Sequence, residues 1–366
     1  MARSGTTLLD KLISLHSDAI VLSQPLPLLY VALKKEFLIR THRLHAVSSR
    51  YPLNDLLSEN YYPAAELEDF LNTFRMTREF VRDVLLRQAS YDGQYHKPER
   101  PLAVLNGFDS DLLAPFLNRY VDFYSTKPAA FVRGSKEPTC EEFVPYLLGQ
   151  NVRVIFLIRD PRDVLASLNF GAGHRYVGRR KPLLFDVRQW RKSVAFALAL
   201  EGHESVLVTR YEDLVTNSTA EMSRLMSFLG LDETQSKFLS GMLVKQSGEV
   251  WRGNSSHFEF DGVSDRSVGH YRSCLTRRDD LFVQSLCYAE LKRLAYPVEI
   301  TNEEIPEILS RYAEERALER EELAPYQWAP IRQREELARW HALVKGEINE
   351  TLFPLAEAFR QLRAAT

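Results

Sequence analysis

The stretch that decides the fold is residues 152–167, which read Val-Arg-Val-Ile-Phe-Leu-Ile-Arg-Asp-Pro-Arg-Asp-Val-Leu-Ala-Ser. Its first seven residues are almost continuously apolar, which is typical of a central strand in a parallel sheet. Asp160 and Pro161 then supply a cap and a first-turn residue, so a helix is predicted directly after the strand. The stretch therefore predicts a strand–turn–helix unit of an α/β domain, with Arg159 at the carboxyl end of the strand.

Three further short apolar segments, at 19–22, 129–133 and 206–208, are predicted strands that alternate with helical patterns. The connections between them are long enough for right-handed crossovers. We therefore expect a three-layer α/β/α fold with a central parallel sheet, of the P-loop NTPase type. Ligands of such sheets bind at the carboxyl ends of the strands.

The chain has 366 residues, of which 45% are hydrophobic, so it can form a large core. We expect a main domain over 1–297 that carries a mainly helical insertion at about 25–127. Residues 298–366 are rich in Glu, Arg, Leu and Ala and predict amphipathic helices without a sustained heptad. We expect this extension to pack on the core or to form a homodimer through its helices.

The overall charge gives no electrostatic reason to expect a nucleic-acid partner, because the net charge is −2. Residues 153–192 carry ten Lys or Arg against three Asp or Glu, a local net charge of +7, which suits an anionic ligand or a solvated face. The three cysteines form no metal or disulfide pattern, and the sequence shows no secretory leader or membrane span. We therefore expect a cytoplasmic protein without a metal.

The start of the chain contains a second candidate site, Arg3-Ser4-Gly5-Thr6-Thr7, followed by an apolar stripe at helical spacing. A glycine turn, two hydroxyls and a cation at a helix N-terminus are typical of an anion site. The alternative is an ordinary N-capped surface helix.

Arg159 and Ser167 form the other half of the pattern. The bidentate guanidinium and a hydroxyl about two helical turns later suit a phosphate group. The alternative is that Asp160 caps the helix while Arg159 and Asp163 form a surface ion pair.

Together the two motifs resemble those of sulfotransferases that use 3′-phosphoadenosine 5′-phosphosulfate (PAPS). In that family the loop cradles the 5′-phosphosulfate, and a strand-end Arg with a later Ser holds the 3′-phosphate. The resemblance implies that the 3′-phosphate is held by Arg159 and Ser167. It implies that the 5′-phosphosulfate is bound by Arg3, Ser4, Gly5, Thr6, Thr7 and Leu8.

Three later elements extend the resemblance. Arg-Tyr-Glu-Asp-Leu at 210–214 implies that Tyr211 lies near the adenine, and Ser-Lys-Glu-Pro at 135–138 implies that Lys136 lies near the sulfuryl group. Trp-Arg-Gly-Asn-Ser-Ser at 251–256 is similar to a loop that closes over the 3′-phosphate, and the likeness continues through 263–271. It implies contacts to the nucleotide from Trp251, Arg252 and Asn254.

The resemblance implies in-line transfer of the sulfuryl group from PAPS to a hydroxyl of a carbohydrate, lipid or small metabolite. The product would be PAP, the desulfonated nucleotide, and no metal would be needed. Arg3 and the loop N–H groups would stabilise the developing charge, and Lys136 would neutralise the bridging oxygen. Only Met1 and Ala2 precede Arg3 in this sequence, whereas a buried strand precedes the loop in the family.

The proton acceptor departs from the family pattern. Many relatives place a Glu before a Pro where this chain has Gln24, and an amide cannot accept the proton. Gln24 would orient the acceptor, while a base comes from elsewhere. The candidates are Glu36, His42, His45 and Glu137.

Two other functions stay open. A P-loop kinase would need Gly-x-x-x-x-Gly-Lys-Ser/Thr, which is absent from the sequence. A non-catalytic protein that binds PAP on the same fold would keep both phosphate motifs and would not need a base.

Overall fold

The computed structural model describes most of the chain, namely residues 3–43, 64–90, 96, 98–138, 140–170, 180–232, 243–244, 249–253, 262–315, 318–319, 321–349, 352–353 and 355–366. The predicted site residue Asn254, the base candidate His45 and most of the loop at 171–182 lie outside these residues. Within the described residues the fold is mixed α/β and mostly helical.

The strands form two parallel pairs and one small antiparallel pair among the described residues. β1 (Ala19–Ser23) pairs with β4 (Val132–Lys136), and β5 (Val154–Ile158) pairs with β6 (Val206–Arg210). β2 (Met76–Thr77) and β3 (Ser110–Asp111) are antiparallel. A single central sheet, as predicted from the alternating pattern, is therefore not seen in this part of the chain.

Side-chain packing, instead of backbone hydrogen bonds, joins the two parallel pairs. One hydrophobic cluster contains residues of both pairs and of α1 (Thr6–Ser14), among them Leu12, Ala19, Val132, Leu157 and Leu207. The four predicted strands are all present, but alternation of strands and helices does not determine which strands share a ladder.

The predicted boundaries of β4 were wrong. The strand begins at Val132 instead of residue 129, and it continues through Ser135 to Lys136 because it pairs with β1 as far as Ser23. Lys136 is therefore the last residue of a strand and not part of the turn that follows it. This places its side chain at the carboxyl end of the β1–β4 pair.

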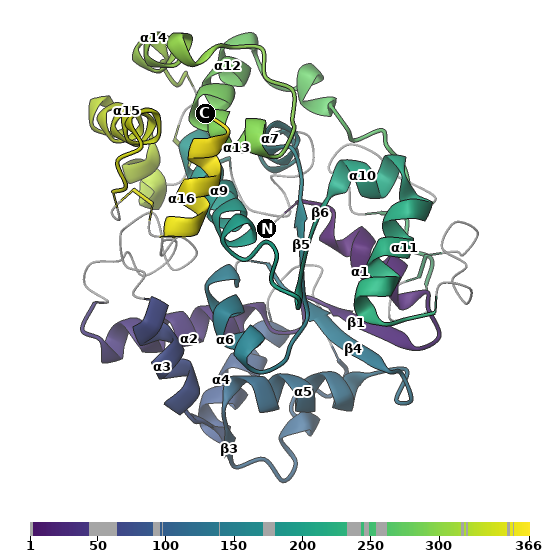
Figure 1. Cartoon of the computed structure of the whole chain (residues 1–366). Helices are drawn as coiled ribbons and strands as arrows, with labels where there is room; N and C mark the ends of the chain where they lie inside the picture. Colours follow the sequence, from purple (N-terminus) through teal and green to yellow (C-terminus); the bar gives the residue numbers. More distant parts are fainter. Residues whose placement is uncertain are drawn as a thin grey trace.

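The insertion at 25–127 is mainly helical in its described part, and its apolar residues form one hydrophobic cluster together with residues of β1, η4 (Glu141–Phe143) and α6 (Val144–Gly149). Tyr30, Phe37, Val84 and Phe116 belong to this cluster. Figure 1 shows its helices gathered on the side of β1 and β4 away from the C-terminal helices. The elements are α2 (Pro27–Arg40), α3 (Ala64–Thr73), α4 (Arg78–Ala89), η3 (Ala103–Leu105) and α5 (Leu113–Tyr124).

The helices of the second half surround β5 and β6. Asp160 caps α7 (Pro161–Asn169) as predicted, since its Oδ1 accepts a hydrogen bond from the Arg162 N–H at 2.9 Å. Two consecutive helices, α12 (Arg277–Leu286) and α13 (Tyr288–Arg293), meet at Cys287. The others are η4 (Glu141–Phe143), α6 (Val144–Gly149), α9 (Leu183–Ala199), α10 (Tyr211–Thr216), α11 (Ser218–Leu229) and η6 (His270–Ser273).

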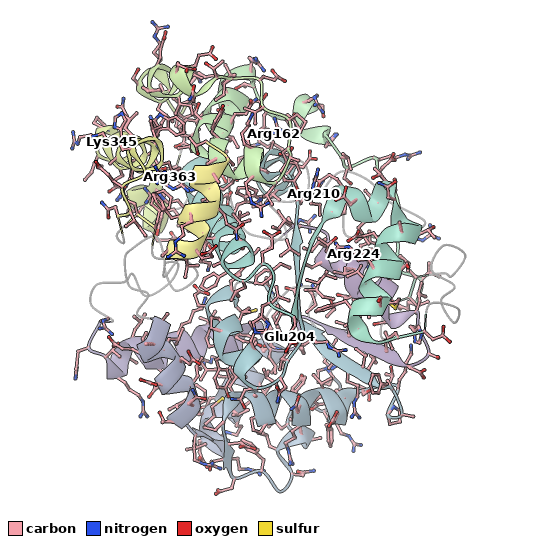
Figure 2. The ribbon with its side chains drawn as sticks, viewed as in Figure 1. Arg162, Glu204, Arg210, Arg224, Lys345 and Arg363 are labelled. Atoms are coloured by element: carbon pink, nitrogen blue, oxygen red, sulfur yellow. The ribbon has the colours of Figure 1, made fainter. Side chains whose placement is uncertain are left out.

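The C-terminal segment contains η7 (Asn302–Glu304), α14 (Ile305–Arg311), η8 (Glu321–Tyr326), α15 (Pro330–Lys345) and α16 (Ala356–Ala364). Trp340 and Phe359 lie in the same hydrophobic cluster as Phe156 of β5 and Trp190 of α9. The exposed Lys345 and Arg363 lie near the ends of α15 and α16 (Figure 2). The segment packs on the core, whereas the domain boundary at 297 and dimerisation stay predictions.

Candidate active site

The loop before α1 has a backbone that only some residues adopt. Arg3 has φ 61° and Gly5 has φ 92°, and Gly5 forms the N-cap of the helix. A Cβ on Gly5 would lie 2.6 Å from Cε2 of Tyr211. Glycine is therefore required twice, for the left-handed conformation and for the close approach of the ring.

The first turn of α1 provides the features of an anion site. A helix start presents backbone N–H groups that lack a carbonyl one turn earlier, which suits an anion. Leu8 and Leu9 donate their N–H groups to the Gly5 carbonyl at 2.9 and 3.2 Å, which fixes the turn. Ser4 is fully buried, and the side chain of Leu8 belongs to the core.

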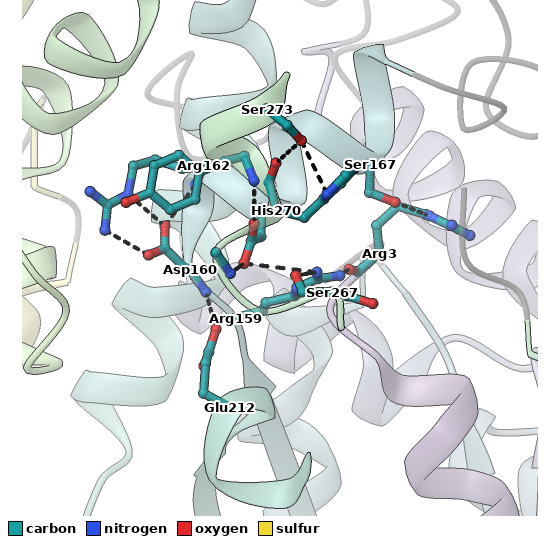
Figure 3. A network of polar contacts seen from close by, with 12 residues as sticks. Arg3, Arg159, Asp160, Arg162, Ser167, Glu212, Ser267, His270 and Ser273 are labelled. Atoms are coloured by element: carbon teal, nitrogen blue, oxygen red, sulfur yellow. Dashed lines mark hydrogen bonds and ion pairs between the residues drawn. The ribbon is translucent and has the colours of Figure 1, made fainter. Parts of the chain in front are cut away.

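The strand-end arginine lies directly against this loop. Arg159 Nη1 donates to the Arg3 carbonyl at 3.3 Å, and its guanidinium lies over the Tyr211 ring at 4.5 Å. Arg3 Nε in turn donates to Ser167 Oγ on α7 at 2.9 Å (Figure 3). The two predicted phosphate motifs, 156 residues apart at Arg3 and Arg159, thus meet at one place.

The alternative interpretation is confirmed in part: Asp160 caps the helix and Arg159 pairs with Asp163, but this ion pair is buried and not on the surface. Arg159 is 7% exposed and Asp163 is 2% exposed, and their closest atoms are 3.9 Å apart. Trp190 Nε1 donates to the Arg159 carbonyl at 2.8 Å and fixes the backbone at the strand end. The Arg159 Nε is enclosed and has no hydrogen-bond partner among the described residues. The guanidinium therefore has a donor available to an anion.

Lys136 reaches the loop from the end of β4. Its Nζ donates to Thr7 Oγ1 at 3.1 Å and lies 3.9 Å from Asp10 Oδ2. Burial lowers the pKa of Lys136, although the Asp10 carboxylate opposes this. Gln24 follows β1 with φ 50° and donates its N–H to the Lys136 carbonyl at 2.8 Å, so the two residues are neighbours.

A comparison with known protein families identifies the family to which the chain belongs. The family model described as "Sulfotransferase family" matches residues 1–235, which contain both phosphate motifs, Lys136 and Tyr211. The chain belongs to the sulfotransferase family. This confirms the resemblance to sulfotransferases noted in the sequence.

A solved structure described as the sulfotransferase domain from the curacin biosynthetic pathway is similar to this sulfotransferase. The two share 16% sequence identity with a TM-score of 0.42, and the match covers 81% of this chain and 96% of the other. No curated protein matches the chain. In the described part of this sulfotransferase, no helix is both long and apolar enough to cross a membrane.

The nucleotide contacts predicted for Trp251, Arg252 and Asn254 lie beyond the residues 1–235 that the family model matches. Trp251 is buried in the cluster that contains α1 and Tyr211, whereas Arg252 is exposed. The segment at 262–275 reaches the site through Ser267, whose carbonyl accepts a hydrogen bond from Arg159 Nη2 at 2.7 Å. Contacts from Trp251 and Arg252 to a nucleotide stay predictions.

The candidates for the general base differ from one another in their surroundings. Glu36 pairs with Arg40 on α2, and His42 is exposed at the end of that helix. Glu137 follows Lys136 directly, and its Oε1 accepts a hydrogen bond from the Leu26 N–H at 2.6 Å. Burial raises the pKa of Glu137 to about 8.

The sequence did not indicate the supporting carboxylates. Asp163 accepts hydrogen bonds from the N–H groups of Gly269 and Tyr271 at 2.7 and 2.8 Å, which holds the segment at 262–275 against α7. Burial raises the pKa of Asp163, and the nearby Arg159 opposes this.

Glu212 supports the end of β5 in a similar way. It accepts a hydrogen bond from the Asp160 N–H at 2.9 Å and another from the Tyr296 hydroxyl at 2.9 Å. Burial raises the pKa of Glu212. Arg210, the last residue of β6, lies over the Tyr296 ring at 4.4 Å near α10 (Figure 2). The only sequence signal for Glu212 was its place inside a quoted motif.

Proposed function

We propose that this sulfotransferase moves the sulfuryl group from PAPS to a hydroxyl of a carbohydrate, lipid or small-metabolite acceptor and releases PAP. The observation that carries the proposal is the meeting of Arg3, Arg159 and Ser167, which joins two anion-recognition elements from distant parts of the chain. A nucleotide with a 5′-phosphosulfate and a 3′-phosphate presents two anionic groups. We also propose that the protein acts in the cytoplasm, which its free cysteines Cys140, Cys274 and Cys287 support.

The described residues fit such a donor. The enclosed Arg159 Nε has no hydrogen-bond partner in the part of the chain that the structure describes, and the first turn of α1 offers backbone N–H groups. The Gly5 backbone leaves no room for a side chain at the turn. PAPS when bound would supply the activated sulfuryl group. We propose that Arg159 and Ser167 hold the 3′-phosphate and that residues 3–8 hold the 5′ end.

The residues of this chain would act by fixed charge. Arg3 and the N–H groups of the loop would stabilise the negative charge that develops on oxygens during transfer, because preorganised donors need no reorganisation. Lys136, held 3.1 Å from Thr7 Oγ1, would neutralise the oxygen that leaves sulfur. Burial of these groups strengthens each charge interaction relative to water.

We propose that Glu137 is the base that accepts the proton of the acceptor hydroxyl. Its Oε2 is enclosed and makes no hydrogen bond among the described residues, while its Oε1 is held by the Leu26 N–H. It follows Lys136, whose carbonyl accepts the N–H of Gln24, the residue at the position where many relatives have their Glu. With a pKa of about 8, only a minority of the Glu137 carboxyl is ionised at neutral pH; this ionised form accepts the proton, and its share grows as the pH rises through about 8. Gln24 would orient the acceptor.

Isothermal titration with PAP tests the proposal. We expect PAP to bind with a Kd of about 1 μM or tighter without magnesium, and ATP with magnesium not to bind. Binding of ATP–Mg without binding of PAP would instead indicate a kinase-like nucleotide site. PAP binding without transfer of labelled sulfate to any hydroxyl acceptor would favour the non-catalytic PAP-binding protein.

A further inference from the structure

Asp10 is a buried carboxylate that the transfer scheme above does not use. It lies in the interior of α1, one turn after Thr7, and is 2% exposed. Neither of its oxygens makes a hydrogen bond of normal geometry among the described residues. The nearest cations are Lys11 Nζ at 3.5 Å and Lys136 Nζ at 3.9 Å.

A carboxylate at this position has no evident structural purpose. The N-cap of α1 is Gly5, so Asp10 does not cap the helix, and its neighbours Leu9, Leu12 and Ile13 are core residues. Buried charges are costly unless they are paired, and apolar replacements of buried ion pairs are often neutral or stabilising. The sequence therefore places a charge where the fold alone favours a leucine.

The position of Asp10 relative to Lys136 suggests its role. The Lys136 ammonium lies between Asp10 Oδ2 and Thr7 Oγ1, and its side chain is only 10% exposed. Asp10 reaches it from α1, and Glu137 reaches it from the adjacent position in the chain. The charges of Lys11 and Arg3 also act on it and lower the pKa of Lys136.

We propose that Asp10 is a positioning residue, the counter-ion that keeps the buried Lys136 ammonium charged and directed at the sulfuryl-transfer end of the loop. The proposal rests on the function proposed above, in which Lys136 faces the 5′ end of the nucleotide. Without Asp10, the charged form of Lys136 would be left in a buried site with Arg3 and Lys11 as its neighbours.

The pKa directions agree with this geometry. Burial lowers the pKa of Lys136, and Asp10 is the strongest of the groups that raise it, followed by Glu137. Burial also raises the pKa of Asp10, against the charges of Lys136 and Lys11 and the nearby Ser23 hydroxyl. Each partner therefore favours the ionised form of the other.

The test is the affinity for PAP as a function of pH, measured by isothermal titration from about pH 6 to about pH 10. In the wild type, affinity should fall at alkaline pH as Lys136 loses its proton. In Asp10→Asn, this fall should begin about one to three pH units lower, because an opposite charge within about 4 Å is removed. At the acidic end, Asp10→Asn should bind PAP at least as tightly as the wild type, since one negative charge is gone.

Two further variants complete the design. Asp83→Asn, at an exposed position on α4, should reproduce the wild-type curve. Lys136→Arg should remove the difference between the curves with and without Asp10→Asn, because a guanidinium stays charged throughout, and any smaller fall that remains in both belongs to Glu137, whose pKa is about 8. This variant also separates Lys136 from Lys11, the other lysine close to Asp10, and it keeps the proposal testable should Asp10→Asn fail to fold.

Each outcome has a definite meaning. An Asp10→Asn curve that parallels the wild type, weakened by one factor at every pH, would show a merely structural role and overturn this inference alone. An unchanged alkaline fall in Lys136→Arg would overturn it as well. Absence of PAP binding by the wild type at every pH would overturn the proposed function and this inference with it.

Discussion

Substitution of Gly5 by alanine tests the geometry of the loop. An alanine there must adopt φ 92°, which costs an L-residue about 1–2 kcal/mol. Its Cβ would also lie 2.6 Å from Tyr211 Cε2, so the ring must move, at a further cost of about 1–3 kcal/mol for overpacking. The free energy of unfolding should therefore fall by about 2–5 kcal/mol in total.

Gly107→Ala is the matched control for this prediction. Gly107 has φ 68°, and a Cβ added there would meet nothing within 4 Å, so its substitution carries the backbone cost without the clash. Urea denaturation should give a loss of about 1–2 kcal/mol for Gly107→Ala and a loss larger by about 1–3 kcal/mol for Gly5→Ala.

The two glycine variants should also differ in ligand affinity. Gly5→Ala displaces the ring that lies beneath Arg159, so PAP should bind about tenfold more weakly or worse, whereas Gly107→Ala should bind it normally. Equal losses of stability in the two variants would refute the close packing of Gly5 on Tyr211. Unchanged PAP affinity in Gly5→Ala would refute the assignment of the loop to the nucleotide.

Three other predictions concern individual charges. Arg159→Ala should weaken PAP far more than adenosine 5′-phosphosulfate, which lacks the 3′-phosphate; equal losses in titrations of both ligands would mean that Arg159 does not hold that group. The infrared band of a protonated carboxylic acid should be present at neutral pH, disappear as the pH rises through about 8, and be missing in Glu137→Gln, because that side chain is protonated below its raised pKa. A spectrum unchanged by the substitution would contradict this. Glu336→Gln leaves the buried Arg191 without its paired carboxylate, while Arg188 keeps only Glu335, so urea denaturation should show a loss of about 3–5 kcal/mol, against almost none for the exposed Glu357→Gln.

The local elements of the fold could be predicted from the sequence with useful accuracy. Residues 152–163 have a continuous apolar run followed by Asp160 and Pro161, and the structure has a strand there and a helix that Asp160 caps. Such signals are local, because the periodicity and the cap belong to one short segment. The grouping of strands into ladders is not local, and the predicted single sheet is absent from the described residues for that reason.

In the candidate site, too, the residues could be selected from the sequence by their type, whereas the contacts between them could not be predicted. Arg3, Arg159 and Ser167 could be selected because their side chains suit an anion, whereas the hydrogen bond from Arg3 to Ser167 could not be foreseen. Gly5 was recognised as the turn residue of an anion site, whereas the close packing of the Tyr211 ring on it could not be foreseen. Asp10 had a signal in the sequence, a carboxylate within an apolar stripe, but its partner Lys136 is brought to it only by the β1–β4 register.

Tyr211 explains how the loop before α1 is held in a defined conformation. One part of its ring packs on Gly5, and the Arg159 guanidinium lies over the same ring. Arg159 then bonds the Arg3 carbonyl, so the loop is held by β5 and α10 together. Among the described residues, the two parallel strand pairs of this fold are joined by side chains only. The buried ring therefore connects the loop before α1, which we assign to the 5′ end of the nucleotide, to Arg159 at the end of β5, which we assign to the 3′-phosphate. Neither element can therefore shift without moving the other.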